Sequence, residues 1–366
     1  MSVPVLLVIA LLLAGCGKFF VSTTTTTTTT TGSGTGNYIY VANATTGTVA
    51  GFSLSTSGLA VTSGSAYSLG VAPSSIATTP NGAFTYVASL AGAVYGYSVG
   101  TGGALTLLNG GSAVISEISP NAIAVDATGK WLVAVDLTPT AYLFQINTST
   151  GLLTQAGSIP LDAGTPNAIT FTPADTLAYV SLGTGGVDIL TFNSTSGSLG
   201  KTNLILSPKS TNNADYGLAV DPESKYLFVT ETGLNAVRAF SIASTGGLSE
   251  LSGSPYATGL GPVAVLVDST GSYVYVANRT DGTISAFTLS TAGALTKVSG
   301  SPFTTGTEPS GLAEDTTDAY LEVANAGGSP DLQVFSIGSG TGVLTSFATA
   351  TTGTDPTGAL AVVSAK

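Results

Sequence analysis

The chain has 366 residues, of which 43% are hydrophobic and only 8% are charged, and it contains 47 glycines. This is enough apolar material for a large core, and so much glycine without long helical patterns favours many short strands joined by tight turns. The formal net charge of −11, with nine Lys and Arg residues in total, excludes a basic surface for nucleic acid and leaves attraction to anionic lipid head groups unsupported.

Two residue types that carry much of enzyme chemistry are absent or nearly absent. The chain has no histidine, and Cys16 is its one cysteine. A Ser-His-Asp triad, an imidazole base, a histidine-containing metal site and a disulfide are therefore excluded. We expect neither a metal nor a cofactor.

The chain starts with a short apolar run, residues 3–16, that ends in small residues. The run is too short for a comfortable membrane span and is typical of an export signal. Its end, Leu13-Ala14-Gly15-Cys16, resembles the lipobox of bacterial lipoproteins. The resemblance implies a signal peptide over residues 1–15 and a lipid on Cys16, hence a protein exported and anchored to the cell envelope. A plain N-terminal anchor helix is the alternative.

Residues 16–36 have no pattern that could form a core. They include nine consecutive threonines, residues 23–31, followed by a stretch of Gly, Ser and Thr. Such a composition is typical of a tether. Twenty fully extended residues span at most about 70 Å, so the folded part would stand away from the membrane that holds the lipid.

From residue 37 to the end of the chain, one pattern recurs every 46–49 residues. Each unit has four short alternating runs separated by turn residues, for example "VAVLVD", "YVYVAN", "ISAFTL" and "LTKVSG" in the sixth unit. The position of the second Tyr of "YVYVAN" recurs as follows: Tyr40, Tyr86, Val133, Tyr179, Phe228, Tyr275 and Glu322. Seven four-stranded units predict an all-β fold, a seven-bladed β-propeller with antiparallel blades over residues 37–366.

The two ends of this region predict how the ring closes. It begins with a second-type strand, "YIYVAN", and it ends with an unmatched first-type strand, "GALAVV", at residues 358–363. The last strand should therefore complete the first blade beside residues 38–42. Closure removes the strand edges that could pair with other chains, and we expect a monomer.

These repeats resemble the lactonase-type seven-bladed propellers. That family includes 6-phosphogluconolactonase-like proteins and muconate lactonizing enzymes of the carboxymuconate type. The resemblance covers residues 37–366 and implies the same fold. For the enzymes of the family, it implies lactone chemistry.

The ends of the second strands offer the most informative candidates for a site. In a propeller, the loops at this end of the blades open on the face that usually holds the ligand. Asp136, Glu231 and Asn278 occupy the same column of the repeat, and Arg279 follows in the sixth blade. Glu231 and Arg279 thus come from neighbouring blades.

The family resemblance extends to two of these residues. Lactonase-type propellers typically carry a Glu in an "NEL"-like motif and, one blade later, an Arg in an "NRG"-like motif, which "TET" (230–232) and "NRT" (278–280) resemble. This implies Glu231 as a candidate catalytic base and Arg279 as a clamp for an anion. The family's Arg-His pair at the start of a first strand is replaced by Tyr216 and Gly217, and Tyr216 could donate a hydrogen bond.

Two functions from different classes follow. The favoured one is a lipid-anchored propeller outside the cytoplasm that binds a small molecule or a cell-surface component without strong catalysis. The Arg-His pair is missing, and a phosphosugar lactone made inside cells would not reach an exported protein. The alternative is a lactone hydrolase with Glu231 as base and Arg279 as clamp. An exposed loop ion pair and a cell-surface spacer also remain open.

Overall fold

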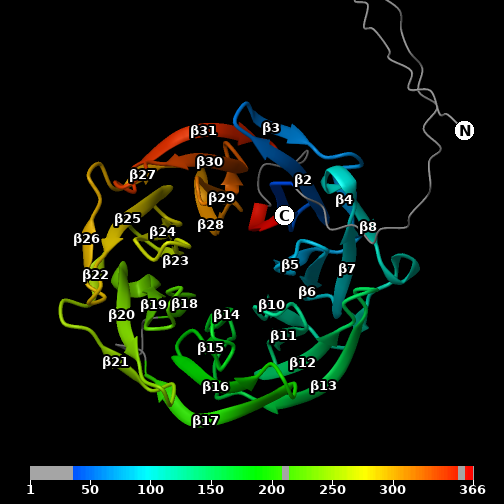
Figure 1. Ribbon diagram of the computed structural model, residues 1–366, viewed down its shortest axis with the longest axis horizontal. Helices are drawn as coiled ribbons and strands as arrows, with labels where there is room; N and C mark the ends of the chain where they lie inside the picture. Colours follow the sequence, from blue (N-terminus) through cyan, green and yellow to red (C-terminus); the bar gives the residue numbers. More distant parts are fainter. Residues whose placement is uncertain (1–35, 208–213, 353–358, 366) are drawn as a thin grey trace, which may run out of the picture. The chain divides into compact units, whose positions relative to one another are not determined.

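The computed structural model describes residues 36–207, 214–352 and 359–365. These residues form seven antiparallel sheets that follow one another around a common axis (Figure 1). The predicted seven-bladed β-propeller is therefore confirmed. The part of the chain described here has no helix long and apolar enough to cross a membrane.

Each blade contains four main strands in sequence order from the axis outward, except in the first blade, where the innermost strand comes from the end of the chain. The first strands are β32 (Ala359–Ala365), β5 (Pro73–Thr78), β10 (Pro120–Val125), β14 (Ala168–Phe171), β18 (Asp215–Val220), β23 (Pro262–Val267) and β28 (Thr307–Glu314). The second strands are β1 (Tyr38–Asn43), β6 (Phe84–Ser89), β11 (Trp131–Asp136), β15 (Leu177–Ser181), β19 (Tyr226–Glu231), β24 (Tyr273–Asn278) and β29 (Tyr320–Gly328).

The third and fourth strands form the outer part of the ring. The third strands are β2 (Thr48–Ser55), β7 (Ala93–Val99), β12 (Thr140–Ile146), β16 (Val187–Asn193), β20 (Ala236–Ile242), β25 (Thr283–Leu289) and β30 (Leu332–Ile337). The fourth strands are β3 (Gly58–Val61), β8 (Leu105–Leu107), β13 (Leu153–Pro160), β17 (Ser198–Leu206), β21 (Leu248–Glu250), β26 (Leu295–Lys297) and β31 (Leu344–Ala350).

A few short elements complete the blades. Short additional strands pair with the third strand in four blades: β4 (Tyr67–Ser68), β9 (Ile115–Ser116), β22 (Tyr256–Ala257) and β27 (Phe303–Thr304). Single 3-10 turns lie in the connections: η1 (Thr101–Gly103), η2 (Asn109–Gly111) and η3 (Thr232–Leu234).

The ring closes as the sequence predicts. Strand β32 pairs antiparallel with β1, from Tyr38 opposite Ala365 to Asn43 opposite Ala359, in the order β3-β2-β1-β32. The closing strand covers residues 359–365 instead of the predicted 358–363, and residue 358 lies outside the described part of the chain. The last strand of the chain is thus the innermost strand of the first blade (Figure 1).

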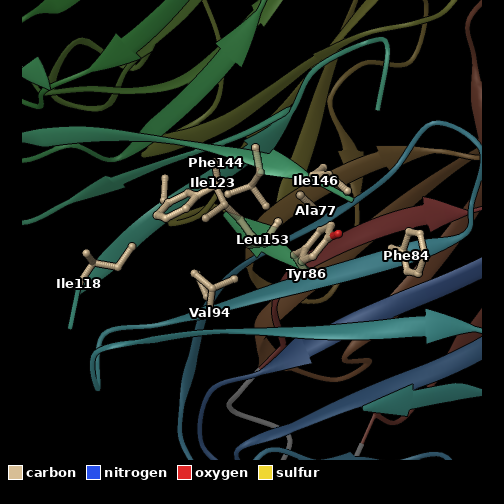
Figure 2. Packing of buried hydrophobic residues seen from close by; sticks show 12 residues of the cluster. Ala77, Phe84, Tyr86, Val94, Ile118, Ile123, Phe144, Ile146 and Leu153 are labelled. Atoms are coloured by element: carbon tan, nitrogen blue, oxygen red, sulfur yellow. The ribbon is translucent and has the colours of Figure 1, made fainter. Parts of the chain in front are cut away.

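The hydrophobic core consists of apolar clusters between neighbouring blades. Figure 2 shows the cluster between blades two and three, where Tyr86 and Val94 face Phe144 and Ile146. One aromatic residue of each third strand is buried in such a cluster: Phe52, Tyr97, Phe144, Phe192, Phe240, Phe287 and Phe335. The blades bury both faces against each other, which explains the alternating pattern of the strands.

A second recurring contact joins neighbouring blades. The hydroxyl of a second-strand tyrosine donates a hydrogen bond to a glycine carbonyl in the hairpin between the third and fourth strands of the next blade. The pairs are Tyr40 to Gly103 at 2.8 Å, Tyr86 to Gly151 at 2.8 Å, Tyr179 to Gly246 at 3.4 Å and Tyr275 to Gly342 at 3.3 Å. Each buried phenol therefore has a polar partner across the blade boundary.

Blade seven has Glu322 at the position of these tyrosines. Glu322 is fully buried, and neither carboxylate oxygen has a hydrogen-bond partner among the described residues. Burial first, and then the charge of Asp315, raise the pKa of Glu322 well above its usual range, while the hydroxyl of Ser364 on the closing strand opposes the shift. The last blade thus carries a buried carboxyl where four other blades carry a satisfied phenol.

We expect the substitution Glu322→Gln to stabilise the protein at neutral pH. A carboxyl whose pKa rises on folding stabilises the native state most at pH values below its ordinary pKa, here 4.5. That stabilising contribution is lost as the pH rises through the pKa that the group has in the folded protein. Glutamine is neutral throughout. Raising a pKa by one unit corresponds to about 1.4 kcal/mol, and each kcal/mol shifts Tm by roughly 2–4 °C in a domain of 150–250 residues.

Thermal unfolding at pH 4 and pH 8 checks this expectation. The two proteins should unfold at similar temperatures at pH 4, and Glu322→Gln should unfold at the higher temperature at pH 8. Asp215 and Glu314, whose pKa values are each raised to about 7 chiefly by burial, are present in both proteins, so their effects cancel in the comparison. The exposed Glu117→Gln is the control. An equal gain from both substitutions would contradict the assignment to Glu322.

Candidate functional site

A cavity of about 370 Å³ lies where the first strands of blades two to seven begin. Its lining is mostly small or polar: Ser74, Ser75, Asn121, Ala122, Ile123, Asn167, Ala168, Ile169, Tyr216, Gly217, Leu218, Val263, Ala264, Val265, Arg279, Ser310, Gly311, Leu312 and Val362. Arg279 is the one charged residue in this described lining. The cavity therefore combines a single positive charge with several amides and hydroxyls.

The small residues at the start of each first strand reflect the crowding near the axis. Gly217 is the clearest case. A Cβ atom there would lie 2.7 Å from the carbonyl oxygen of Val263 and 2.8 Å from the Cα atom of Ala264. Both are backbone atoms of the next blade, so a side chain at this position would force the blades apart. The backbone itself thus excludes a histidine where the family resemblance expects one.

Polar side chains at the cavity join the starts of neighbouring blades. The hydroxyl of Ser74 donates to the carbonyl of Pro120 at 2.6 Å, and the amide of Asn121 donates to the carbonyl of Pro166 at 2.7 Å. The amide of Asn167 reaches the carbonyl of Asp215 at 3.4 Å. These bonds fix the orientation of the polar groups around the cavity and hold three blade boundaries together.

Tyr216 and Arg279 are the two predicted site residues that the structure brings to this cavity. Tyr216 is 37% exposed. The Arg279 side chain is 45% exposed and forms an ion pair with Glu308, whose Oε2 atom lies 2.9 Å from Nη2. The Nε atom of Arg279 donates to the same oxygen at 3.3 Å. Arg279 is therefore accessible at the rim of the cavity while it is already paired with a carboxylate.

Glu231 lies elsewhere, buried within blade five. It is absent from the described lining of the cavity, and its Oε1 atom accepts a hydrogen bond of 2.6 Å from Nη1 of Arg238. Arg238 also pairs with Glu250 at 3.1 Å and packs over the ring of Phe240 at 4.6 Å. The carboxylate that the family resemblance gives as a base thus lies in an internal ion-pair network and outside the described lining of the cavity that Arg279 reaches.

Asp215 adds a second acid to this buried network. It is fully buried at the start of β18, opposite Glu231 in the pairing of β18 with β19. Burial first, and then the negative charge of Glu231, raise the pKa of Asp215 to about 7, while the positive charge of Arg238 lowers it. Among the described residues, neither of its carboxylate oxygens has a hydrogen-bond partner.

The other two predicted binding residues brace loops. Asp136 is buried, and its carboxylate accepts hydrogen bonds from the backbone amide and the hydroxyl of Thr138 at 3.0 and 2.7 Å. Asn278 is buried, and its amide nitrogen donates to Thr283 and Ser285 at 3.0 Å each. Neither Asp136 nor Asn278 belongs to the described lining of the cavity.

Several residues at or near the site were not predicted from the sequence. Ser74, Asn121 and Asn167 each directly follow a proline near the start of a first strand, whereas the sequence predictions concentrated on the ends of the second strands. Arg238 lies two residues after the strand partner of Glu231 on the same face, which places it diagonally across the hairpin. Nothing in the repeat indicates that Glu308 reaches Arg279.

Two further predictions concern sites other than the cavity. In the described ranges no group of three or more Asp, Glu, Cys or His side chains is arranged so that it could hold a metal ion. Cys16, the predicted lipidation site, lies outside the described residues, as do residues 1–15 and most of the predicted tether.

Comparison with solved structures shows the same fold in several proteins. A periplasmic gluconolactonase from Pseudomonas aeruginosa aligns with a TM-score of 0.73 and 15% identity over 90% of this chain and 99% of that one. A candidate 6-phosphogluconolactonase from Bacteroides uniformis ATCC 8492 aligns with a TM-score of 0.71 and 19% identity over 85% and 95%. A Lactobacillus plantarum protein gives 0.73 and 19% over 90% and 99%.

Sequence comparison identifies the family. No curated protein matches the chain at a significant level. The sequence pattern of the family described as "Lactonase, 7-bladed beta-propeller" matches residues 31–171 and 162–362, which together include most of the chain. With the repeat, the closed ring and these matches in agreement, the chain belongs to the lactonase family of seven-bladed β-propellers.

Proposed function

We propose that this propeller binds a small hydroxylated carboxylic acid in the central cavity and does not act as an efficient lactone hydrolase. The observation that carries the proposal is the position of Arg279, an accessible guanidinium at the rim of a cavity lined mostly by small or polar residues. The volume of about 370 Å³ lies within the range typical of small-molecule sites.

The two kinds of polar group at the cavity suit the two parts of such a ligand. A planar guanidinium binds a carboxylate through paired, charge-assisted hydrogen bonds. The hydroxyl of Tyr216 and the amides of Asn121 and Asn167 can exchange hydrogen bonds with the hydroxyl groups of a sugar acid. Because backbone contacts hold Asn121 and Asn167 in place, they offer an ordered surface that loses little entropy on binding.

The preference for binding over turnover rests on the positions of Glu231 and Gly217. Lactone hydrolysis needs a base within reach of the attacking water. Glu231 directs its carboxylate to Arg238 inside blade five, and the backbone around Gly217 leaves no room for an imidazole. The periplasmic gluconolactonase of Pseudomonas aeruginosa shares the fold, which makes gluconate and its lactone the first compounds to try.

We further propose that the protein works outside the cytoplasm as a monomer, held to the cell envelope by a lipid on Cys16. The support for this proposal is the sequence "LLLAGC" followed by the threonine-rich segment. A single acyl chain gives only marginal membrane binding, whereas two or more chains on one N-terminus make a stable anchor. The ligand or cell-surface component would then come from the surroundings of the cell.

We expect Arg279→Gln to weaken gluconate binding about 10- to 100-fold, because a hydrogen bond to a charged group contributes roughly 1.5–3 kcal/mol. Isothermal titration calorimetry of the purified protein measures the effect. Lys225→Gln, which removes a cation from the exposed Lys225–Glu223 ion pair, is the matched control and should bind like the wild type. Equal affinities of wild type and Arg279→Gln would overturn the proposed site.

Glu231→Gln should leave gluconate affinity within about twofold of the wild type, as expected for a position that does not contact the ligand. In parallel, the opening of glucono-δ-lactone and of carboxylated lactones is measured by the release of acid. The wild type should open these lactones no faster than buffer alone. Acceleration by the wild type that is lost in Glu231→Gln would instead support the hydrolase function.

In a bacterial host, the wild-type protein should take up an alkyne-tagged fatty acid and sediment with membranes. Because Cys16 is the one cysteine of the chain, Cys16→Ser should lose most of the label and shift to the soluble fraction. Fractionation and in-gel fluorescence measure both properties. Unchanged sedimentation of Cys16→Ser would argue against the lipid anchor and for an N-terminal anchor helix.

A further inference from the structure

We propose that Glu308 is an internal carboxylate that competes with the ligand for Arg279 and thereby sets the affinity of the cavity for acids. The inference rests on the proposed function, because it assigns an affinity-determining residue to the same anion site. It also predicts an effect that the cavity lining alone does not give, namely that removing the Glu308 carboxylate tightens the binding of an acid.

The contact between the two side chains imitates ligand binding. One carboxylate oxygen of Glu308, Oε2, accepts hydrogen bonds from Nη2 and Nε of Arg279 at 2.9 and 3.3 Å. These two nitrogens form the side edge of the guanidinium, which is one of the edges that carboxylates bind. The Glu308 carboxylate therefore occupies one edge of the guanidinium that the carboxylate of a bound acid could use.

Arg279 lies between two hollows of the surface. It lines the central cavity, and together with Glu308 it also lines a second, open hollow of about 570 Å³ formed by the loops of blades six and seven. The Arg279 and Glu308 side chains are 45% and 54% exposed. Both can therefore move without breaking up a packed core, and Glu308 has solvent-accessible space to move into.

The backbone at Glu308 indicates that its side chain has a role. Glu308 adopts a left-handed conformation with φ of 52°, directly before Pro309 and at an irregularity in the pairing of β28 with β29. In blade six the corresponding residue before the proline is Gly261, with φ of 67°. Glycine accepts this conformation without strain and glutamate does not. The fold alone would therefore favour glycine at residue 308.

An exposed ion pair is weak, so a ligand can replace it. A carboxylic acid provides a new negative charge for Arg279 when Glu308 leaves, and the guanidinium remains paired. An uncharged lactone has no such charge, and its binding would leave Arg279 either with Glu308 or without a partner. The pair thus lowers the affinity for every acid that binds at Arg279, by the same competition.

Calorimetric titration of gluconate into wild type, Glu308→Gln, Glu308→Gly and Arg279→Gln tests the inference. Glu308→Gln and Glu308→Gly should each bind gluconate about 2- to 5-fold more tightly than the wild type, because the competing charge is gone. The glycine variant also relieves the left-handed backbone, so a folding defect cannot explain its result. Glu223→Gln makes the same change in net charge in the exposed pair with Lys225 and is the control.

A second readout does not depend on the ligand. The chain has two arginines, of which Arg238 has a side chain only 6% exposed. Phenylglyoxal should therefore modify Arg279 first, faster in Glu308→Gln than in wild type, with Arg238 as the internal reference in the mass spectrum. Gluconate should slow the modification of Arg279 in both proteins.

The outcomes separate this inference from the proposed function. If wild type and Glu308→Gln bind gluconate equally, or the variant binds more weakly, competition by Glu308 is wrong while the anion site stands. If no protein of the set binds gluconate, the proposed function fails. The phenylglyoxal rates then decide on Glu308 alone: equal rates with and without its carboxylate would show that it does not shield Arg279.

Discussion

The pairing of β32 with β1 is the contact on which the rest of the structure depends. A single four-stranded blade cannot bury both of its faces, so each blade is stable only between two neighbours. The first blade obtains its innermost strand, β32, from the other end of the chain.

 In the other six blades, all four main strands follow one another along the chain. Closure therefore couples the two ends of the propeller, and the closing strand contributes to both apolar clusters that flank the first blade, through Val363 and Ala365 in one and Val362 in the other.

The same constraint explains the character of the cavity. Six first strands begin close to one axis, so their first residues have to be small, and at Gly217 the next blade leaves no space for any side chain. Polar groups such as Asn121 fit one position earlier, where they can reach the backbone of the following blade. The site is thus built mainly from residues that also hold the ring together, and Arg279 is the exception because it comes from a turn.

The sequence predicts the fold well because every copy of the repeat gives the same information. Strand order, closure by the last strand and the burial of third-strand aromatics such as Phe144 all follow from position in the repeat. Side-chain partners do not follow from position. Glu231 and Arg279 share one face by repeat logic, yet each pairs with a different residue, Arg238 and Glu308, which the other blades lack at the equivalent positions. A column of a repeat therefore locates a residue but does not identify its contacts.

The two arginines show how burial decides between a structural and a binding role. Both pair with glutamate at short distance, 2.6 Å for Arg238 and 2.9 Å for Arg279. Arg238 is enclosed between two carboxylates and an aromatic ring, and removing a partner there would leave a charge without solvent, which is costly. Arg279 keeps almost half of its side chain in solvent, so exchanging Glu308 for another carboxylate costs little. Of the two, only the exposed pair can open for a ligand, and this difference in exposure, more than the family resemblance, supports the proposal of an anion site at Arg279.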